Sequence, residues 1–511
     1  MDQPDSTAVA RLRTLTQALG SGGGQISPAV YDTARALALS STDTPTRQHR
    51  LQWLIAQQQP DGGWGSPHIP RARDLPTLAA VLALHDHPSA QASYRKGLDF
   101  LHEHARCHWA APLPQDLPVG LELTLPALLR EAARQGIRLP DVYAPLHTLG
   151  KIRRRIIGAR SPQGPGTPAV HCWETWAAPG DASLVDGSGG IGHSPAATIA
   201  WLHFNRATTP WPLVEGAERY LKGAQAATHA RRPLLPTVWP ITHFERVWCL
   251  HALALSRLTD HPQLKDVCDW QLDRIAEALS PTGLGMSDHF MVDGDVTATA
   301  LATLALTGRP ADSAILERFR THDHYGTYPG ELQSSVTTTA HAVHALAVTG
   351  TAPESLSAEP VDYLLSRQDD NGRWAGDKWH SSWIYTTAQT LTALLNHPPA
   401  RRAALRAVQA LISSQNPDGS WGTRAIPSAG ETGYATLALH VTHTTGPPFP
   451  EITEALHRAT TWLRAWHQDG ASCGCGLWIG KDLYCPTRLD AAVALTALTA
   501  ETDINMPGPV Q

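Results

Sequence analysis

The sequence predicts a nearly all-α fold built from repeated helical hairpins. Apolar residues recur at intervals of three and four, the period of amphipathic helices, along residues 296–308, 338–350, 386–395, 433–442 and 490–500. Each of these segments ends near Gly, Pro, Asn or Thr, which are typical of helix ends. Alternating strand patterns are scarce, and most β-branched residues fall inside the helical segments. We therefore expect few strands.

Three short segments share one plan, which indicates internal duplication. QQPDGGWG (residues 58–65), QDDNGRWAG (368–376) and QNPDGSWG (415–422) each contain Gln, a spacer, an Asp-Gly or Asn-Gly turn, and Trp. Trp374 and Trp421 are 47 positions apart, about the length of one helical hairpin. Gly permits a left-handed turn after a helix, Trp covers the end of a neighbouring helix, and Gln bonds to free helix-terminal groups. The unit specifies architecture and not chemistry.

The spacing of these units indicates an insertion. The first copy is far from the second, and the gap contains Pro-rich connectors at residues 104–118 and 159–170. We interpret the gap as a second helical domain inserted into the first. Stacked helical hairpins tend to close or curve around a concave surface, which in an apolar version makes a cavity.

Composition excludes several classes of protein. The 511 residues carry a net charge of −5 and 17% charged residues, with no basic field for nucleic acid. No uninterrupted apolar run reaches the ~20 residues that a transmembrane helix needs. The N-terminal residues lack a signal-peptide pattern, and the seven cysteines, an odd number spread along the chain, suit reduced thiols. We expect a cytoplasmic protein.

Further motifs follow one another along nearly the whole chain. They are SPAVYDTARAL (residues 27–37), DLPTLAAVLAL (74–84), LPVGLELTLPALL (117–129), GHSPAATIAWL (192–202), WPITHFERVW (239–248), DKWHSSWIYTTA (377–388) and LWIGKDLYCP (477–486). In this order they resemble the bacterial class II terpene cyclases, related to copalyl and halimadienyl diphosphate synthases and more distantly to squalene-hopene cyclase. One departure is Arg35, which stands where the family usually has Trp.

The resemblance implies the domain organisation. Family members have two α/α-barrel domains, called β and γ, with the active site between them. Transferred to this chain, the β domain comprises residues 1–35 and 235–511 and carries the acid motif. The γ domain comprises the inserted residues 36–234, in agreement with the insertion inferred from spacing.

The resemblance also implies a proton donor. DGDVTA (residues 293–298) matches the family's D-x-D-D-T-A motif, in which the middle Asp protonates an alkene, except that Val296 replaces the last Asp. Asp295 is therefore the expected general acid. An ordinary Asp, with a pKa of about 3.9, is ionised at neutral pH, but burial and the neighbouring Asp293 would keep one proton on the pair. This requires a helix-entry segment, which Gly294 favours. His341 aligns with a position that supports the acid, and we expect it to hydrogen-bond to Asp295.

The remaining site residues are assigned through the matched motifs. Cyclisation passes through cations that need an aromatic, water-free wall, and the chain has 17 Trp but only six Phe. The expected wall residues are Trp239, Trp379, Trp383 and Tyr385. The terminating base is left open between His193 and Tyr484. The expected diphosphate ligands are Arg73, Lys481 and Lys378. Mg2+ is the expected cofactor, with Glu122 as its remaining protein ligand because the acid-rich N-terminal motif is missing.

The predicted function is cyclisation of geranylgeranyl diphosphate to a bicyclic diterpene diphosphate. The chain lacks the D-D-x-x-D cluster with which class I enzymes remove diphosphate, so the diphosphate should survive. A class I terpene synthase or a phosphatase would then act on the product. Three alternatives stay open: cyclisation of farnesyl diphosphate to a drimane-type product, a zinc-dependent protein prenyltransferase β-subunit, and a non-catalytic helical-barrel binding protein.

Overall fold

A computed structural model of the protein describes residues 6–40, 43–67, 69–109, 117–159, 164–175, 181–331, 333–350, 354–395, 397–445, 449–470 and 476–504. In these residues the regular structure is almost entirely helical. Strands occur as two short antiparallel pairs, β1 (Leu284–Gly285) with β2 (Val292–Asp293) and β3 (Trp478–Ile479) with β4 (Leu483–Tyr484). The predicted all-α class is confirmed.

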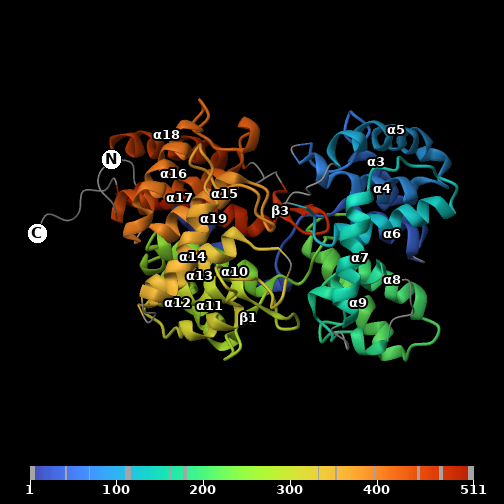
Figure 1. The fold of residues 1–511 in the computed structure, drawn as a ribbon, viewed down its shortest axis with the longest axis horizontal. Coiled ribbons are helices and arrows are strands. Elements are labelled where there is room, and N and C mark those ends of the chain that lie inside the picture. Colours follow the sequence, from blue (N-terminus) through green and yellow to red (C-terminus); the bar gives the residue numbers. More distant parts are fainter. Residues whose placement is uncertain are drawn as a thin grey trace, which may run out of the picture.

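The helices form two lobes that lie side by side (Figure 1). The large lobe contains α1 (Ser6–Ala18), α10 (Thr242–Leu255), α11 (Lys265–Ala278), α12 (Gly294–Leu306), α13 (Val336–Thr349), α14 (Glu354–Ser366), α15 (Trp383–Leu394), α16 (Arg401–Ser413), α17 (Ala429–Thr445), α18 (Pro450–Gln468) and α19 (Thr487–Ile504). The small lobe contains α2 (Val30–Leu39), α3 (Thr44–Ala56), α4 (Asp74–Leu84), α5 (Gln91–His108), α6 (Leu121–Arg134), α7 (Ala144–Ala159), α8 (Pro195–Asn205) and α9 (Trp211–Ala227).

Each lobe is an α/α-barrel. In the large lobe, contacts run around a closed inner ring of α10, α12, α13, α15, α17 and α19, and an outer helix packs against most members of the ring. In the small lobe the inner ring is α2, α4, α6 and α8, joined by the 3-10 helix η4 (Pro168–Thr175), and the outer helices are α3, α5, α7 and α9. The two-barrel architecture expected from the family resemblance is therefore present.

The inner helices are buried on all sides, which their composition permits. In α12 every residue from Gly294 to Leu304 is buried, and most are Ala, Thr or Leu. The Thr hydroxyls are satisfied within the helix: Thr299 donates to the carbonyl oxygen of Asp295 at 2.9 Å, and Thr303 donates to that of Thr299 at 2.7 Å. Small side chains that satisfy their own hydroxyls can therefore pack close together without buried, unpaired donors.

The three Gln-to-Trp repeats tie successive outer helices together, as predicted. Trp64, Trp374 and Trp421 are all fully buried, and each indole N–H donates to a carbonyl in the last turn of the preceding outer helix, at Leu54, Leu364 and Leu411 respectively, over 2.7–2.8 Å. In each repeat the Gln amide donates to a carbonyl in the first two turns of the next outer helix, at Ser93, Ala403 and Ala455. The glycine two residues before each Trp has φ between 81° and 94°, which favours Gly.

The chain enters and leaves the small lobe at one seam. The backbone N–H of Ile26 donates to Ala227 at 3.1 Å, and that of Ala29 donates to Leu235 at 2.8 Å. The small lobe is therefore an insertion between two stretches of the large lobe. The predicted boundary after residue 35 falls inside α2, whose contacts are with α4 and α8 of the small lobe. We accordingly place the first boundary in the loop before Val30.

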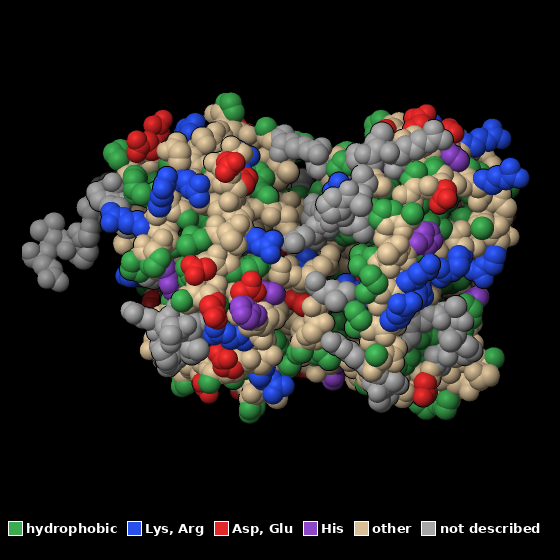
Figure 2. Space-filling model, in the orientation of Figure 1, with side chains coloured by type: hydrophobic (Ala, Val, Ile, Leu, Met, Phe, Trp, Pro, Cys, Tyr) green, Lys and Arg blue, Asp and Glu red, His purple; other side chains and the backbone are tan. Residues whose placement is uncertain are grey.

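Charge is distributed differently over the two lobes. On the face in Figure 2, acidic and basic side chains are interspersed over the large lobe, whereas Lys and Arg side chains form a band across the small lobe near α7 and α8.

Of the helices that the structure describes, none is both long enough and apolar enough to cross a membrane.

Candidate active site

A chamber of about 110 Å3 lies between the lobes. The small lobe contributes Val119, Pro168 and His171, and the large lobe contributes the rest of the wall. Two carboxyl groups, those of Asp293 and Asp295, face this otherwise mostly apolar space. The expected position of the site between two barrels is therefore correct.

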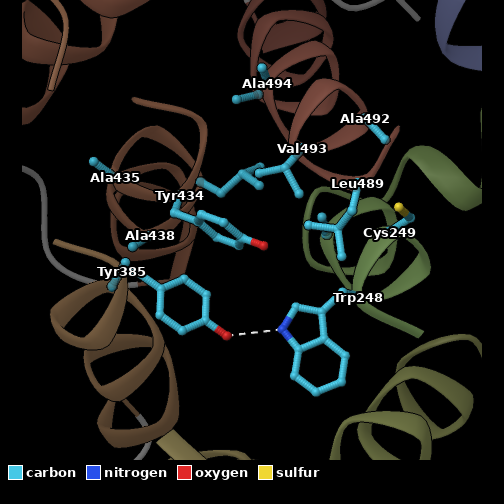
Figure 3. Close-up of a cluster of buried hydrophobic side chains, with 14 of the residues drawn as sticks. Trp248, Cys249, Tyr385, Tyr434, Ala435, Ala438, Leu489, Ala492, Val493 and Ala494 are labelled. Carbon is cyan, nitrogen blue, oxygen red and sulfur yellow. Dashed lines mark hydrogen bonds between the residues drawn. The ribbon is translucent and has the colours of Figure 1, made fainter. Parts of the chain in front are cut away.

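Seven aromatic side chains line the chamber with the two carboxyls: Phe244, Trp248, Phe290, Tyr328, Trp379, Trp478 and Tyr484. Several are held in place by contacts behind the wall. The Trp248 indole donates to the Tyr385 hydroxyl at 2.9 Å, and Tyr434 lies beside that pair in the barrel interior (Figure 3). The Trp379 indole donates to Thr327 Oγ1 at 2.8 Å. Two of the aromatic wall residues are therefore anchored by hydrogen bonds.

The two carboxyls lie at the entry to α12, as the sequence analysis required. Asp293 is the N-cap, and its side chain accepts from the backbone N–H of Val296 at 2.7 Å. Asp295 is in the first turn of the same helix. A Cβ at Gly294 would collide with the carbonyl oxygen of Gly326, so Gly lets the chain pass closely here. Burial, reinforced by the nearby Asp295 carboxyl, raises the pKa of Asp293 well above its usual range.

His341, on α13, makes the predicted hydrogen bond to the acid motif. Its Nδ1 is 2.6 Å from Asp295 Oδ1, and its Nε2 is 3.1 Å from Gln389 Oε1 on α15. Burial disfavours the imidazolium, but the Asp295 carboxylate and the hydrogen bonds outweigh it and raise the pKa of His341. Acceptors at both ring nitrogens suit the doubly protonated ring.

His171, on η4, is a neutral histidine that faces the chamber. Burial lowers its pKa to about 3. Its Nδ1 is 2.8 Å from the carbonyl oxygen of Gly192. A carbonyl only accepts, so the ring's single proton is on Nδ1 and Nε2 keeps its lone pair. The sequence analysis missed this residue, which no quoted motif contains.

A second cavity of about 410 Å3 adjoins the chamber and shares Val119, Pro168, Tyr328 and Trp379 with it. Its charged side chains are Glu122, Arg153, Glu331 and Lys378. Arg153 Nε donates to Glu122 Oε1 at 2.8 Å, and the Lys378 ammonium pairs with Glu331. Lys378 and Glu122 were predicted from the sequence, whereas Arg153 was not. Within the described parts of the chain, no three His, Cys, Asp or Glu side chains lie close enough to form a metal site by themselves.

Two predicted diphosphate ligands line neither cavity. Both amino groups of Arg73 bind Asp61 at 2.7 Å, and its guanidinium lies over the Phe100 ring. Lys481 is fully buried and pairs with Glu174 at 2.7 Å; it also donates to the carbonyl oxygen of His171 at 3.0 Å. The geometry gives both cations structural roles and does not support the predicted ones. Lys481 holds the segment that carries His171.

The predicted wall residues also separate into one that lines the chamber and others that do not. Trp379 lines the chamber, whereas Trp239, Trp383 and Tyr385 do not. Trp239 donates to Gly22 and packs on Tyr220, Trp383 lies under the Arg373 guanidinium, and Tyr385 is behind Trp248. Of the two bases left open, Tyr484 faces the chamber. His193 is outside it, with its nitrogens directed at Asp186 and Ser287.

Buried carboxyls facing an aromatic chamber between two helical barrels define a class II terpene cyclase. The comparisons agree. Residues 332–446 match the family model for the squalene-hopene cyclase C-terminal domain. The chain is 41% identical to (+)-kolavenyl diphosphate synthase from Herpetosiphon aurantiacus over 96% of this chain and 97% of that one. It is 32% identical to copalyl diphosphate synthase from Streptomyces cyslabdanicus, covering 93% and 92% of the two chains.

A solved structure gives the same result. The ent-copalyl diphosphate synthase from Streptomyces platensis superposes with a TM-score of 0.81 at 29% identity, over 97% of this chain and 100% of that one. The chain belongs to the bacterial class II diterpene cyclases. The prenyltransferase and non-catalytic alternatives are therefore set aside.

Proposed function

We propose that the enzyme protonates geranylgeranyl diphosphate and closes it to a bicyclic diterpene diphosphate without losing the diphosphate. The observation that supports this most directly is the arrangement of the two cavities. The aromatic chamber with Asp295 suits a hydrocarbon tail, and the charged cavity beside it suits a diphosphate. The relatives named above are themselves diphosphate synthases.

The diphosphate would be held by Arg153 and Lys378 through charge-assisted hydrogen bonds. Both cations line the adjoining cavity, and each is already paired with a carboxylate there, Arg153 with Glu122 and Lys378 with Glu331. These pairs hold the two cations in place before the substrate arrives. Trp379, which lines both spaces, lies where the tail and the head group of the substrate would meet.

Asp295 would be the proton donor, with His341 positioning it. As an imidazolium, His341 donates to Asp295 Oδ1 and to Gln389 Oε1, which leaves Asp295 Oδ2 to carry the reacting proton. The positive ring then stabilises the carboxylate that remains after the proton has moved to the alkene. The surrounding aromatic wall excludes water and stabilises the cations by cation–π contact.

This assignment predicts how activity depends on pH. Because its pKa is raised, His341 is charged below that pKa and loses its charge as the pH rises through it. The wild-type rate should therefore fall on the alkaline side. His341→Gln should lower kcat by about 100-fold and should shift this alkaline limb, because the general acid itself must still be protonated. Rates measured across a pH series for both proteins test this, with circular dichroism to confirm the fold. An unchanged alkaline limb in the variant would remove His341 from the role.

His171 would accept the final proton. His171 lines the same chamber as the acid, its Nε2 keeps a lone pair, and a neutral imidazole can take a proton without first losing one. The base and the acid then come from different lobes. Termination would occur on the small-lobe side of the chamber.

Replacing His171 should change the products more than the rate. In His171→Phe the cyclised cation lacks its base, so we expect a mixture with displaced double bonds or captured water, and less than a 10-fold loss in substrate consumption. Gas chromatography with mass spectrometry after dephosphorylation measures both. His147→Gln, an exposed histidine on α7, is the control. An unaltered single product from His171→Phe would exclude it as the base.

The enzyme would bind Mg2+ through Glu122. Mg2+ is commonly bound by one or two carboxylates together with substrate phosphates, and Glu122 faces the cavity beside the cations proposed to hold the diphosphate. The donor set therefore fits an ion completed by substrate oxygens. When bound, the ion would neutralise part of the diphosphate charge.

A product assay tests the proposed function. The enzyme is incubated separately with geranylgeranyl and farnesyl diphosphate, with Mg2+ or with a chelator, and the dephosphorylated products are analysed by mass spectrometry. We expect a bicyclic C20 alcohol from the first substrate, formed faster with Mg2+. Selective conversion of the C15 substrate would favour the drimane alternative, and recovery of both substrates unchanged would contradict the proposal. Because the product keeps its diphosphate, a reaction that removes it must follow.

A further inference from the structure

The small lobe contains a third cavity, of about 620 Å3, that belongs to neither part of the active site. It is bounded by the C-terminal ends of α2 and α8, by the first half of α3, by α9, and by the loop at residues 233–235. None of its lining residues lines the chamber or the adjoining charged cavity. It is a separate space.

The cavity is lined by Arg50, a buried cation that forms no salt bridge with any described residue. Arg50 is only 2% exposed, and buried arginines are normally paired. The other buried Arg and Lys side chains in the described residues each form a salt bridge: Arg35 with Glu131, Arg73 with Asp61, Lys378 with Glu331, Lys481 with Glu174, and Arg488 with Glu245. Arg50 is the exception in the part of the chain that the structure describes.

The contacts that Arg50 does make are all with neutral groups. Its Nε donates to the carbonyl oxygen of Pro233 at 3.1 Å, and its Nη1 donates to Ser40 Oγ at 2.9 Å and to the carbonyl oxygen of Ala36 at 3.5 Å. These bonds use some of the N–H donors of the guanidinium and help cap the C-terminal end of α2. None of these groups is negatively charged, and burial together with the nearby Arg47 lowers the pKa of Arg50 to about 10, although the Asp43 carboxylate partly opposes this.

The rest of the lining suits an anion with an apolar body. Lys222, on α9, forms no salt bridge within the described residues, whereas Glu218, the cavity's acidic side chain, is paired with Arg206. The basic groups therefore outnumber the acidic one. Apolar walls are supplied by Leu39, Ile199, Leu202, Leu221 and Leu235. The volume falls in the range of about 300–1,000 Å3 that small-molecule sites occupy.

We propose that this cavity binds an amphiphilic organic phosphate, with Arg50 and Lys222 on the head group and the leucine-rich walls on the chain. Arg50 would donate from Nη2 to the phosphate oxygens, whose negative charge would complete the salt bridge that Arg50 lacks within the described residues. The proposal rests on the proposed function in one respect: the amphiphilic phosphate that such an enzyme meets is a prenyl diphosphate, its substrate or product. It adds a second prenyl diphosphate site, remote from the acid.

Calorimetric titration of the full-length Asp295→Asn variant with geranylgeranyl diphosphate tests the stoichiometry without turnover. We expect two equivalents to bind. Adding Lys222→Met should weaken the second equivalent by at least about 5-fold, and adding Arg50→Met should abolish it. Lys96→Met, an exposed lysine of α5 that does not line the cavity, should change neither. Inorganic diphosphate should occupy the second site more weakly than the prenyl compound, because it lacks the apolar chain.

Binding of a single equivalent would overturn the proposal, as would a second equivalent that both variants leave unchanged. If Arg50→Met fails to fold because it also loses the cap on α2, Lys222→Met still decides the matter. Equal affinities of the second site for geranylgeranyl diphosphate and inorganic diphosphate would contradict the proposed contacts between the apolar walls and the prenyl chain. The proposed function is tested independently: Lys222→Met in the wild-type background should retain full cyclase activity at low substrate concentration, so failure of one proposal is distinguishable from failure of the other.

Discussion

Replacing Asp295 with Asn is expected to lower the rate of cyclisation by about 1,000-fold while leaving the fold and substrate binding intact. The amide has nearly the same volume as the acid and can still accept a hydrogen bond from His341. It has no proton acidic enough to be transferred to an alkene. Single-turnover measurements with geranylgeranyl diphosphate give the rate, and titration with the same substrate gives the affinity. Activity close to wild type would remove Asp295 from the role of acid.

Asp293→Asn is the matched control for this experiment. Asn caps helices about as well as Asp, so the variant keeps the bond to the backbone of Val296 and removes only the second carboxyl. Asp293 faces the same chamber, and burial raises its pKa, so it is the competing candidate for the proton donor. We expect a smaller loss than in Asp295→Asn. A larger loss would transfer the role of acid to Asp293.

Trp421→Ala is expected to have the largest effect on stability, about 3–5 kcal/mol. The side chain is fully buried, its indole donates to Leu411, and its backbone N–H is bound by Thr432 Oγ1 at 2.9 Å. Truncation would leave a cavity and would remove the indole's hydrogen bond to the end of α16. Urea denaturation followed by circular dichroism measures the change.

Trp270→Ala is the control for that measurement. Trp270 is on α11 of the same lobe and is half exposed, so its removal should change the free energy of unfolding by about 0.5 kcal/mol or less. Similar losses in the two variants would mean that the Gln-to-Trp repeats do not tie the outer helices together.

The features that the sequence predicted correctly depend on residues close together in the chain. Gln415, Gly419 and Trp421 specify a turn within seven residues, and Asp293 and Asp295 specify the entry of one helix. Their geometry is local, so a motif is enough. The bond from His341 to Asp295 was predicted only because the family resemblance supplied a contact between different helices.

The site residues that the structure does not support have partners outside their own motifs. Arg73 and Lys481 were assigned to the diphosphate because they are basic and lie in matched motifs, but their partners are Asp61 and a residue 307 positions away, Glu174. The same limit applies to the chamber wall. The motif at residues 239–248 contains both Trp239 and Trp248, and only the closure of the barrel determines that Trp248 lines the chamber.

The contacts Ile26–Ala227 and Ala29–Leu235 bring together the two points at which the chain enters and leaves the small lobe. Recombination between relatives at these two neighbouring points would exchange the small-lobe side of the chamber, together with the residue at position 171. The proton donor would stay in the original large lobe. Initiation and termination could thus diversify separately, so a family of hydrocarbon skeletons could arise from one unchanged starting step.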